Sequence, residues 1–205
     1  MTRFQWLKIW TIQALVISLP SLALCTEYEI DSSHSSVTFS VAHLGISTVK
    51  GTFKKFKGTF AWEKDKPEAW KTLVTIDPAS IDTNDKKRDD HLRNPDFFDV
   101  KKFKEITFKS TKVTDVDDEK AKVHGVLTMH GVSKDVILEV EHKGEVTDPW
   151  GNKKAVFTGE TKVNRKDYGM TWNKSLDKGG LVVGEEVTIN LEIEGNAKAT
   201  KLSKN

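Results

Sequence analysis

The chain has 205 residues, and its 32 Lys and Arg are nearly balanced by 30 Asp and Glu, for a formal net charge of +2. This balance argues against nucleic-acid binding, which generally rests on an excess of basic side chains across a surface. Cys25 is the only cysteine, so no intramolecular disulfide is available and stability must come from the core.

Residues 1–25 are expected to form a cleavable export signal. Arg3 and Lys8 give a positive start, residues 9–24 are mostly apolar, and Ala23-Leu24-Cys25 is a small-x-small cleavage site. No second apolar run is long enough to span a membrane. We therefore expect a periplasmic protein with no integral membrane segment once the signal is removed.

Cleavage after Cys25 leaves residues 26–205 as one domain, with 30 basic and 30 acidic residues. The alternative is a lipoprotein in which Cys25 is the lipidated first residue. This alternative is less favoured because Leu24 stands where a small residue is expected.

The first half of this domain alternates apolar and polar residues with the period of 2 that is typical of β-strands. Glycines at probable bends divide the longest of these segments, which is expected to be one strand or a hairpin. The expected strands begin at Tyr28, cover residues 37–41, 46–63 and 73–76, and end before Asp77-Pro78.

Residues 81–111 interrupt the alternation with charges at helical spacing and an aromatic pair. We expect a short exposed helix from Asp85 to Leu92, stopped by Asn94-Pro95. Phe97-Phe98 then form an apolar tip before the chain re-enters a strand at Glu105. This segment is expected to lie as a lid on an all-β body.

The second half contains five further segments with strand alternation. With the earlier ones they give about eight or nine strands, which predicts an antiparallel barrel or sandwich; closure into a barrel removes exposed edges. The segments are Glu105–Lys112, Lys122–His130, Val136–Val146, Ala155–Val163 and Glu186–Glu194.

A barrel of about eight strands is either filled by its own side chains or wide enough to hold one small ligand. Small residues interrupt the apolar faces and leave room if they point inward. They fit bulges or close packing equally well. These residues are Gly125, Ala155, Gly159 and Thr161.

His91 lies among Arg88, Asp89, Asp90 and Arg93. A histidine with an orienting carboxylate is the makeup of a general base, and guanidinium groups bind anions. A charge run of this kind is more often a solvated helix face. Anion binding stays open, whereas catalysis is the less favoured interpretation.

The other chemical signals are weak. His34 and His43 lie about 30 Å apart if the strand between them is extended, and no cysteine set supports zinc, so we expect no metal site. Ser36 and Ser110 lack the context of an activated serine. We expect neither a catalytic residue nor a cofactor.

A set of aromatic residues has two interpretations. It is either the core that an all-β domain needs, or the lining of an apolar pocket. In a pocket, each buried CH₂ of a chain ligand contributes about 0.8 kcal/mol. The set is Phe39, Phe60, Trp62, Phe97, Phe98, Phe108, Phe157 and Trp172.

Four motifs in order carry a resemblance: DSSHSSVTFSVAHLGISTVKGTF, RDDHLRNPDFFDVKKFKEITFKST, GVLTMHGVSKDVILEV and VNRKDYGMTW. Together they resemble the YceI-like family of exported lipid-binding proteins across essentially all of residues 26–205. The resemblance implies an extended lipocalin-like antiparallel barrel whose apolar channel holds a polyisoprenoid or other long-chain amphiphile. It also implies a helical insertion at DDHLRNPDFF and, in many members, a homodimer.

The resemblance also implies site residues. Asp167-Tyr168-Gly169-Met170 matches the family's D-[FY]-G-M turn, where Arg165 and Asp167 are expected to be structural. An anionic head group is expected to meet Arg88, His91 or Arg93. The full set of expected ligand contacts is Phe39, Val41, Phe60, Trp62, Phe98, Ile106, Phe108, Leu127, Phe157, Met170, Trp172, Arg88 and His91.

The leading hypothesis is therefore a periplasmic carrier of a long-chain isoprenoid or fatty-acyl amphiphile that performs no chemistry. A second hypothesis is a lipid hydrolase or isomerase with His91 or His34 as base. A third is a stress-related interaction module with a filled barrel.

Overall fold

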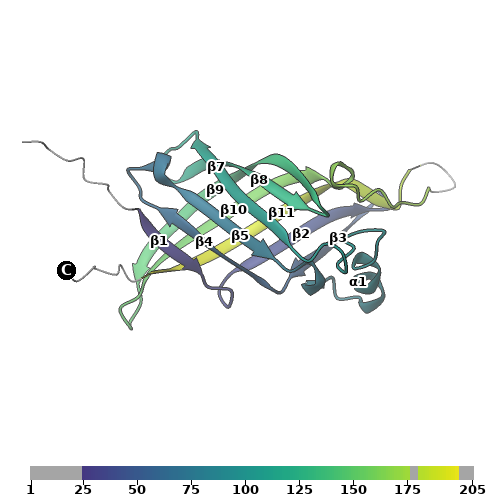
Figure 1. Cartoon of the computed structure of the whole chain (residues 1–205), viewed down its shortest axis with the longest axis horizontal. Coiled ribbons are helices and arrows are strands. Elements are labelled where there is room, and N and C mark those ends of the chain that lie inside the picture. Colours follow the sequence, from purple (N-terminus) through teal and green to yellow (C-terminus); the bar gives the residue numbers. More distant parts are fainter. Residues whose placement is uncertain (1–24, 176–179, 199–205) are drawn as a thin grey trace, which may run out of the picture.

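The computed structural model describes residues 25–175 and 180–198. The predicted export signal, apart from Cys25, lies outside these residues. Within the described ranges the fold has eleven strands and one α-helix (Figure 1). The strands are β1 (Thr26–Ile30), β2 (Ser36–His43), β3 (Ser47–Phe53), β4 (Phe56–Trp62), β5 (Lys71–Ile76), β6 (Ile81–Asp82), β7 (Ile106–Thr114), β8 (Lys120–Met129), β9 (Val132–Thr147), β10 (Lys153–Asn164) and β11 (Val183–Ala197), and the helix is α1 (Lys86–Leu92).

Eight of the strands form a closed antiparallel ring in the order β1-β4-β5-β7-β8-β9-β10-β11, and β11 pairs back with β1. The expected all-β barrel of about eight strands with a short helical insertion is thus confirmed. Closure gives the backbone groups of the first and last strands partners within the same sheet. No helix among the described residues has the length and apolarity needed to cross a membrane.

The barrel is lengthened by strands that break and change partners. β11 pairs with β1 through residues 195–197 and with β2 through residues 183–192. The segment 46–63, expected as one strand or a hairpin, is divided into β3 and β4 at positions 54–55. β3 pairs with β2 and β6, whereas β4 pairs with β1 and β5. The two halves therefore continue one wall of the barrel and do not form a hairpin.

The helix α1 lies at the end of the barrel formed by β2, β3 and β6 (Figure 1). The Asp85 carboxylate caps it by accepting hydrogen bonds from the backbone N–H groups of Lys87 and Arg88, at 2.9 and 3.1 Å. The expected helix over 85–92 is confirmed within one residue. We call this the helical end, and the opposite end, where β1 begins, the far end.

Candidate ligand cavity

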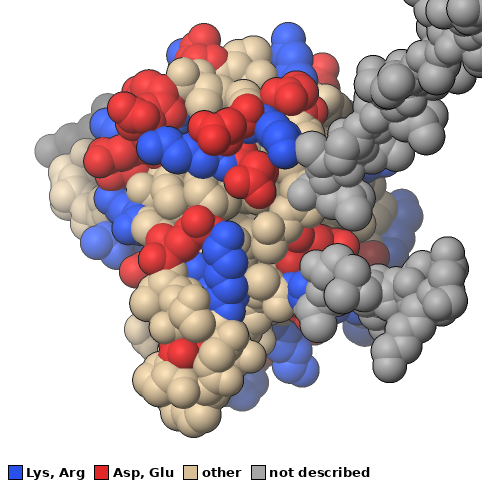
Figure 2. All heavy atoms as spheres, turned by 90° about the vertical axis from the view of Figure 1, so that its left-hand side faces the viewer, with Lys and Arg blue, Asp and Glu red and all other residues tan. Residues whose placement is uncertain are grey.

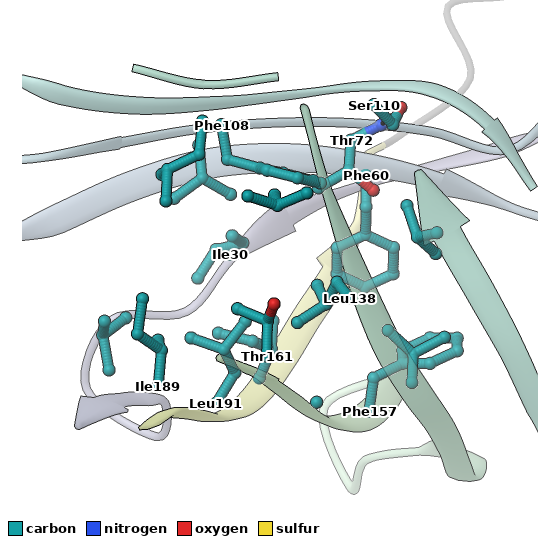
Figure 3. Close-up of a pocket in the computed structure, with 18 of the residues that line it drawn as sticks. Ile30, Phe60, Thr72, Phe108, Ser110, Leu138, Phe157, Thr161, Ile189 and Leu191 are labelled. Carbon is teal, nitrogen blue, oxygen red and sulfur yellow. Dashed lines mark hydrogen bonds between the residues drawn. The ribbon is translucent and has the colours of Figure 1, made fainter. Parts of the chain in front are cut away.

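Side chains from opposite walls of the barrel converge on an apolar cavity (Figure 3). Its volume is about 160 Å³, measured as the space open to the centre of a water molecule. On this measure one water needs only about 10–15 Å³. β5 and β7 contribute one wall, with Phe108, and β9, β10 and β11 contribute the other, with Leu138 and Ile189. The barrel is therefore not filled by its own side chains.

Some of the small residues noted in the sequence leave room inside the barrel, and others allow close packing. Gly159 and Thr161 line the cavity, so they leave room inside. Gly125 serves close packing, because a Cβ atom there would lie 2.5 Å from ring atoms of Phe108. Ala155 is fully buried in the aromatic cluster of the far end.

Four of the residues that line the cavity carry hydroxyl groups: Thr72, Ser110, Thr158 and Thr161. Ser110, one of the two serines considered as a nucleophile, accepts a hydrogen bond from the backbone N–H of Thr72 at 2.8 Å. This bond links β5 and β7 near an irregularity in the β7–β8 register. Its hydroxyl thus serves the sheet, as expected for an ordinary strand serine.

Six of the expected contacts line the cavity, and they come from four strands. Those from β4 lie toward the far end, and those from β7, β8 and β10 complete the wall. They are Phe60, Trp62, Ile106, Phe108, Leu127 and Phe157. Whether they touch a ligand stays a prediction.

The other seven lie elsewhere. Phe39, Phe98 and Met170 pack with Tyr168 into an apolar cluster at the helical end, which shares Phe53, Ile106 and Leu127 with the cavity wall. The ring centres of Phe39 and Phe98 each lie 5.7 Å from that of Phe53. Val41, Arg88, His91 and Trp172 also lie outside the cavity lining.

The charged residues of α1 fasten the helix to the barrel. Asp89 is 7% exposed, and its carboxylate accepts hydrogen bonds from the backbone N–H and the hydroxyl of Thr83, at 2.9 and 2.6 Å. The Arg88 guanidinium donates to the hydroxyl and carbonyl of the same threonine, both at 2.8 Å. Arg93 donates to the carbonyls of Ala79 and Ile81. The inward face of this charge run is therefore structural.

His91 lies in the same region. Its Nε2 lies 2.8 Å from Asp96 Oδ2, and its ring meets the edges of Phe97 and Trp172 at 5.1 and 4.8 Å between centres. The orienting carboxylate that a general base needs is present. The imidazole nevertheless packs among aromatic rings of the lid and does not line the cavity.

Arg165 closes the helical end from the other side. It is 4% exposed, and its guanidinium donates to the backbone carbonyls of Met170, Trp172, Val183 and Gly184. Burial lowers the pKa of this guanidinium, while Glu185 acts in the opposite direction. These bonds hold the turn after β10 against the start of β11, which fits the expected structural role.

Aromatic rings close the cavity at the far end. The rings of Trp62 and His142 stack with centres 4.3 Å apart, and Phe157 lies 5.8 and 5.0 Å from them. Trp70 lies 6.2 Å from Trp62. Trp62, Trp70 and Phe157 line both the cavity and a small hollow on its outer side. This aromatic partition separates the cavity from that hollow.

The residues that sequence analysis missed fall into two groups. Leu138, Ile189, Leu191 and Ile193 occupy alternate positions in two of the predicted strands, so strand alternation identifies them. Trp70 follows a short 3-10 helix and carries no such signal. His142 is in phase with Leu138 on β9, but its polar ring set it apart from the apolar residues.

One cluster has the residue types of a metal site. Asp31, His34 and Glu194 offer ligand atoms that all lie within 4.8 Å of one another. The Lys154 ammonium lies 2.6 Å from Glu194 Oε1 and 3.8 Å from Asp31 Oδ2. Hydrogen bonds from Ser33 and His34 lower the pKa of Asp31. The lysine thus supplies the positive charge, and the cluster is an ion-pair network.

Comparison with known proteins gives matches over most of the chain. The sequence profile of the YceI-like domain matches residues 28–195. A UPF0312 protein of Vibrio cholerae is 41% identical over 159 residues, which are 77% of this chain and 84% of that protein. The crystal structure of a Campylobacter jejuni YCEI protein aligns with a TM-score of 0.67 at 35% identity, covering 77% of this chain and 90% of that one.

A polyisoprenoid binding domain from Saccharophagus degradans has the same fold, with a TM-score of 0.65 at 14% identity, covering 85% of this chain and 99% of that one. The resemblance carried by the four sequence motifs is confirmed by the profile match, which runs from β1 to β11. The chain belongs to the YceI-like domain family.

Proposed function

We propose that this protein binds one long-chain isoprenoid or fatty-acyl amphiphile inside its barrel and carries it through the periplasm without chemical change. The observation that carries the proposal is the apolar cavity of about 160 Å³ enclosed by β4, β5 and β7–β11. Empty apolar cavities of this kind bind apolar molecules, because they offer water few hydrogen-bond partners.

The energetics favour a chain-like ligand. Burial contributes about 0.8 kcal/mol per CH₂, so ten carbons supply roughly 8 kcal/mol before ordering costs are subtracted. The name of the Saccharophagus degradans domain, which refers to polyisoprenoid binding, supports the same ligand class. The apolar stretch over residues 9–24 and its positive start support export.

The positions of the histidines favour carriage over catalysis. Neither His91 nor His34, the two bases of the enzyme hypothesis, lines the cavity. The open interior likewise disfavours the hypothesis of an interaction module with a filled barrel.

The test is a cavity-filling substitution with a neighbouring control. Leu138 lines the cavity and is 8% exposed, whereas the next residue of β9, Ile137, is 46% exposed. Leu138→Trp is expected to fill the interior and abolish binding of a C20 isoprenoid, and Ile137→Trp to leave binding unchanged. Native mass spectrometry of the purified protein, with and without added lipid, measures both the complex and the oligomeric state, and so also tests the homodimer expectation.

Two outcomes contradict the proposal. One is a wild-type protein that binds neither isoprenoid nor fatty-acyl chains. The other is a folded Leu138→Trp variant that binds as tightly as the wild type.

A further inference from the structure

Two ring nitrogens of the aromatic partition are buried without a hydrogen-bond partner. They are Trp62 Nε1 and His142 Nε2. Within the described residues one other side-chain atom shares this property, the hydroxyl of Tyr168, which lies in the cluster of the helical end and outside the cavity lining. A buried polar group without a partner destabilises the fold, so such groups call for an explanation.

The two nitrogens are chemically complementary. The indole N–H of Trp62 is only a donor. Burial lowers the pKa of His142, which favours the neutral ring, while Glu145 and the backbone of Gly144 act in the opposite direction. Nε2 has no partner, and in one neutral tautomer the proton is on Nδ1. Nε2 is then left as an acceptor.

A donor and an acceptor on two stacked rings, whose centres lie 4.3 Å apart, match one hydroxyl group, which accepts from the first and donates to the second. The position suits the polar end of a chain ligand, because Trp62 lines both the apolar cavity and the outer hollow while His142 lines the hollow. Trp62 is 6% exposed, so the contact is shielded from water.

The charges around the outer hollow argue against an anionic head group. Its lining includes the bases Lys64 and Lys120 but three acids, Asp117, Asp118 and Glu119. Lys64 Nζ already lies 3.5 Å from Asp118. Figure 2, which looks onto this end, shows acidic and basic side chains interspersed and no field of one sign. A diphosphate or carboxylate would therefore meet as much repulsion as attraction.

The charges at the helical end lead to the same conclusion. Arg88 and Arg93, which the sequence suggested for an anionic head, are held by backbone carbonyls and Thr83. They lie outside the cavity lining.

We propose that the far end of the cavity is a head-group site for an uncharged hydroxyl, which accepts a hydrogen bond from Trp62 Nε1 and donates one to His142 Nε2. This inference rests on the proposed carrier function and names the class of ligand, a long-chain alcohol. The chain lies along the barrel toward the helical end. Because the stacked rings cover both nitrogens, the head enters as the rings of Trp62 and His142 move apart.

The experiment compares three probes with one chain: geranylgeraniol, the same hydrocarbon chain without the hydroxyl, and geranylgeranyl diphosphate. Their affinities are measured for the wild type, Trp62→Phe and His142→Phe. Each substitution keeps an aromatic ring and removes one nitrogen partner. Trp150→Phe is the control, since Trp150 is 83% exposed on the hairpin at the same end.

We expect the wild type to prefer the alcohol to the hydrocarbon and to gain nothing from the diphosphate. Each test variant is expected to bind the alcohol about 3- to 10-fold more weakly, the loss of one neutral hydrogen bond. Binding of the hydrocarbon is expected to stay unchanged in all variants, which also shows that the cavity is intact.

Other results overturn the head-group site and leave the carrier function standing: equal losses for alcohol and hydrocarbon, no loss for either, or a wild type that binds the diphosphate more than tenfold tighter than the alcohol. If the wild type binds none of the three probes and no fatty-acyl chain, the carrier function itself fails.

Discussion

The two ends of the barrel are closed by different means. At the helical end, charged side chains satisfy backbone groups: Arg165 and Arg88 donate to carbonyls, and Asp89 accepts from the N–H of Thr83. At the far end, stacked aromatic rings close the cavity and leave Trp62 Nε1 and His142 Nε2 without partners. The helical end is thus built for stability, and the far end keeps unused hydrogen-bonding capacity beside an apolar space.

The largest expected effect is that of Arg165→Ala. Its removal leaves buried carbonyls of the turn after β10 without donors, and such groups cost about 1–3 kcal/mol each when water does not replace the donor. We expect the free energy of unfolding to fall by about 3 kcal/mol or more, measured by urea denaturation. The control is Lys166→Ala, which removes only a surface pair with Glu185. Similar losses for the two variants would contradict the importance assigned to Arg165.

Asp89→Ala tests the other fastening of the helical end. The substitution removes the acceptor for the backbone N–H and hydroxyl of Thr83, so we expect a loss of about 2 kcal/mol. Hydrogen exchange is expected to quicken in α1 before it quickens in β7–β11. Asp90→Ala is the matched control, because Asp90 is 53% exposed in its pair with Lys86. Equal effects at the two positions would show that burial of Asp89 contributes nothing.

Strand alternation and the helical spacing of charges made much of this fold predictable. The five strands from β7 to β11 and the helix over 85–92 were expected within a few residues, because both signals are local in sequence. The cavity wall followed from the same period of 2. The division of 46–63 into β3 and β4 could not be predicted, because it depends on the pairing of each half with a different neighbour.

Contacts between residues that lie far apart in the sequence could not be predicted either. Asp31 and Glu194 become neighbours only because β1 pairs with β11, so the ion-pair network with His34 gives no local pattern. Phe39 was expected in the channel from the family resemblance. Its ring packs against Phe53, which lines the cavity and also contacts Phe98.

The ion pair between Glu145 and Lys153 makes the stability of the far end depend on pH. Burial raises the pKa of Glu145, but hydrogen bonds from Lys153 and Tyr28 outweigh this effect, and the net result is a lowered pKa. A carboxyl with a lowered pKa stabilises the fold above its unfolded pKa, about 4.3, and loses that contribution as the pH falls through the folded value. Glu145→Gln is expected to lower the free energy of unfolding by about 1 kcal/mol at pH 7, and by progressively less as the pH falls below 4.

Unfolding free energies of wild type and variant across this pH range measure the effect. The control is Glu160→Gln, an exposed position on β10. A cost of Glu145→Gln that stays constant down to pH 2 would show that its charge contributes no stability.

The smallest effect is expected for His142→Phe. This change removes a buried acceptor without a partner, which favours the fold, and the interaction with the backbone of Gly144, which opposes it, and it keeps a ring for stacking on Trp62. The free energy of unfolding is therefore expected to stay within about 1 kcal/mol of the wild type. Thermal denaturation of the two proteins side by side measures it. A loss of unfolding free energy as large as that of Arg165→Ala would contradict the conclusion that the helical end contributes more to stability than the far end.

The pairing of β1 with β11 also governs how the protein reaches its native state. Tyr28 lies opposite Ala197, so the ring is completed by contacts between the first and last strands. Contacts this distant in sequence form late and slow folding. Until β11 docks, the apolar inner faces of the earlier strands stay open to solvent. A hydrophobic chain present at that stage contacts the inner face of an unclosed sheet, and docking of the last strand then encloses it. Assembly of the barrel therefore offers a route for loading a ligand that does not depend on opening the finished wall.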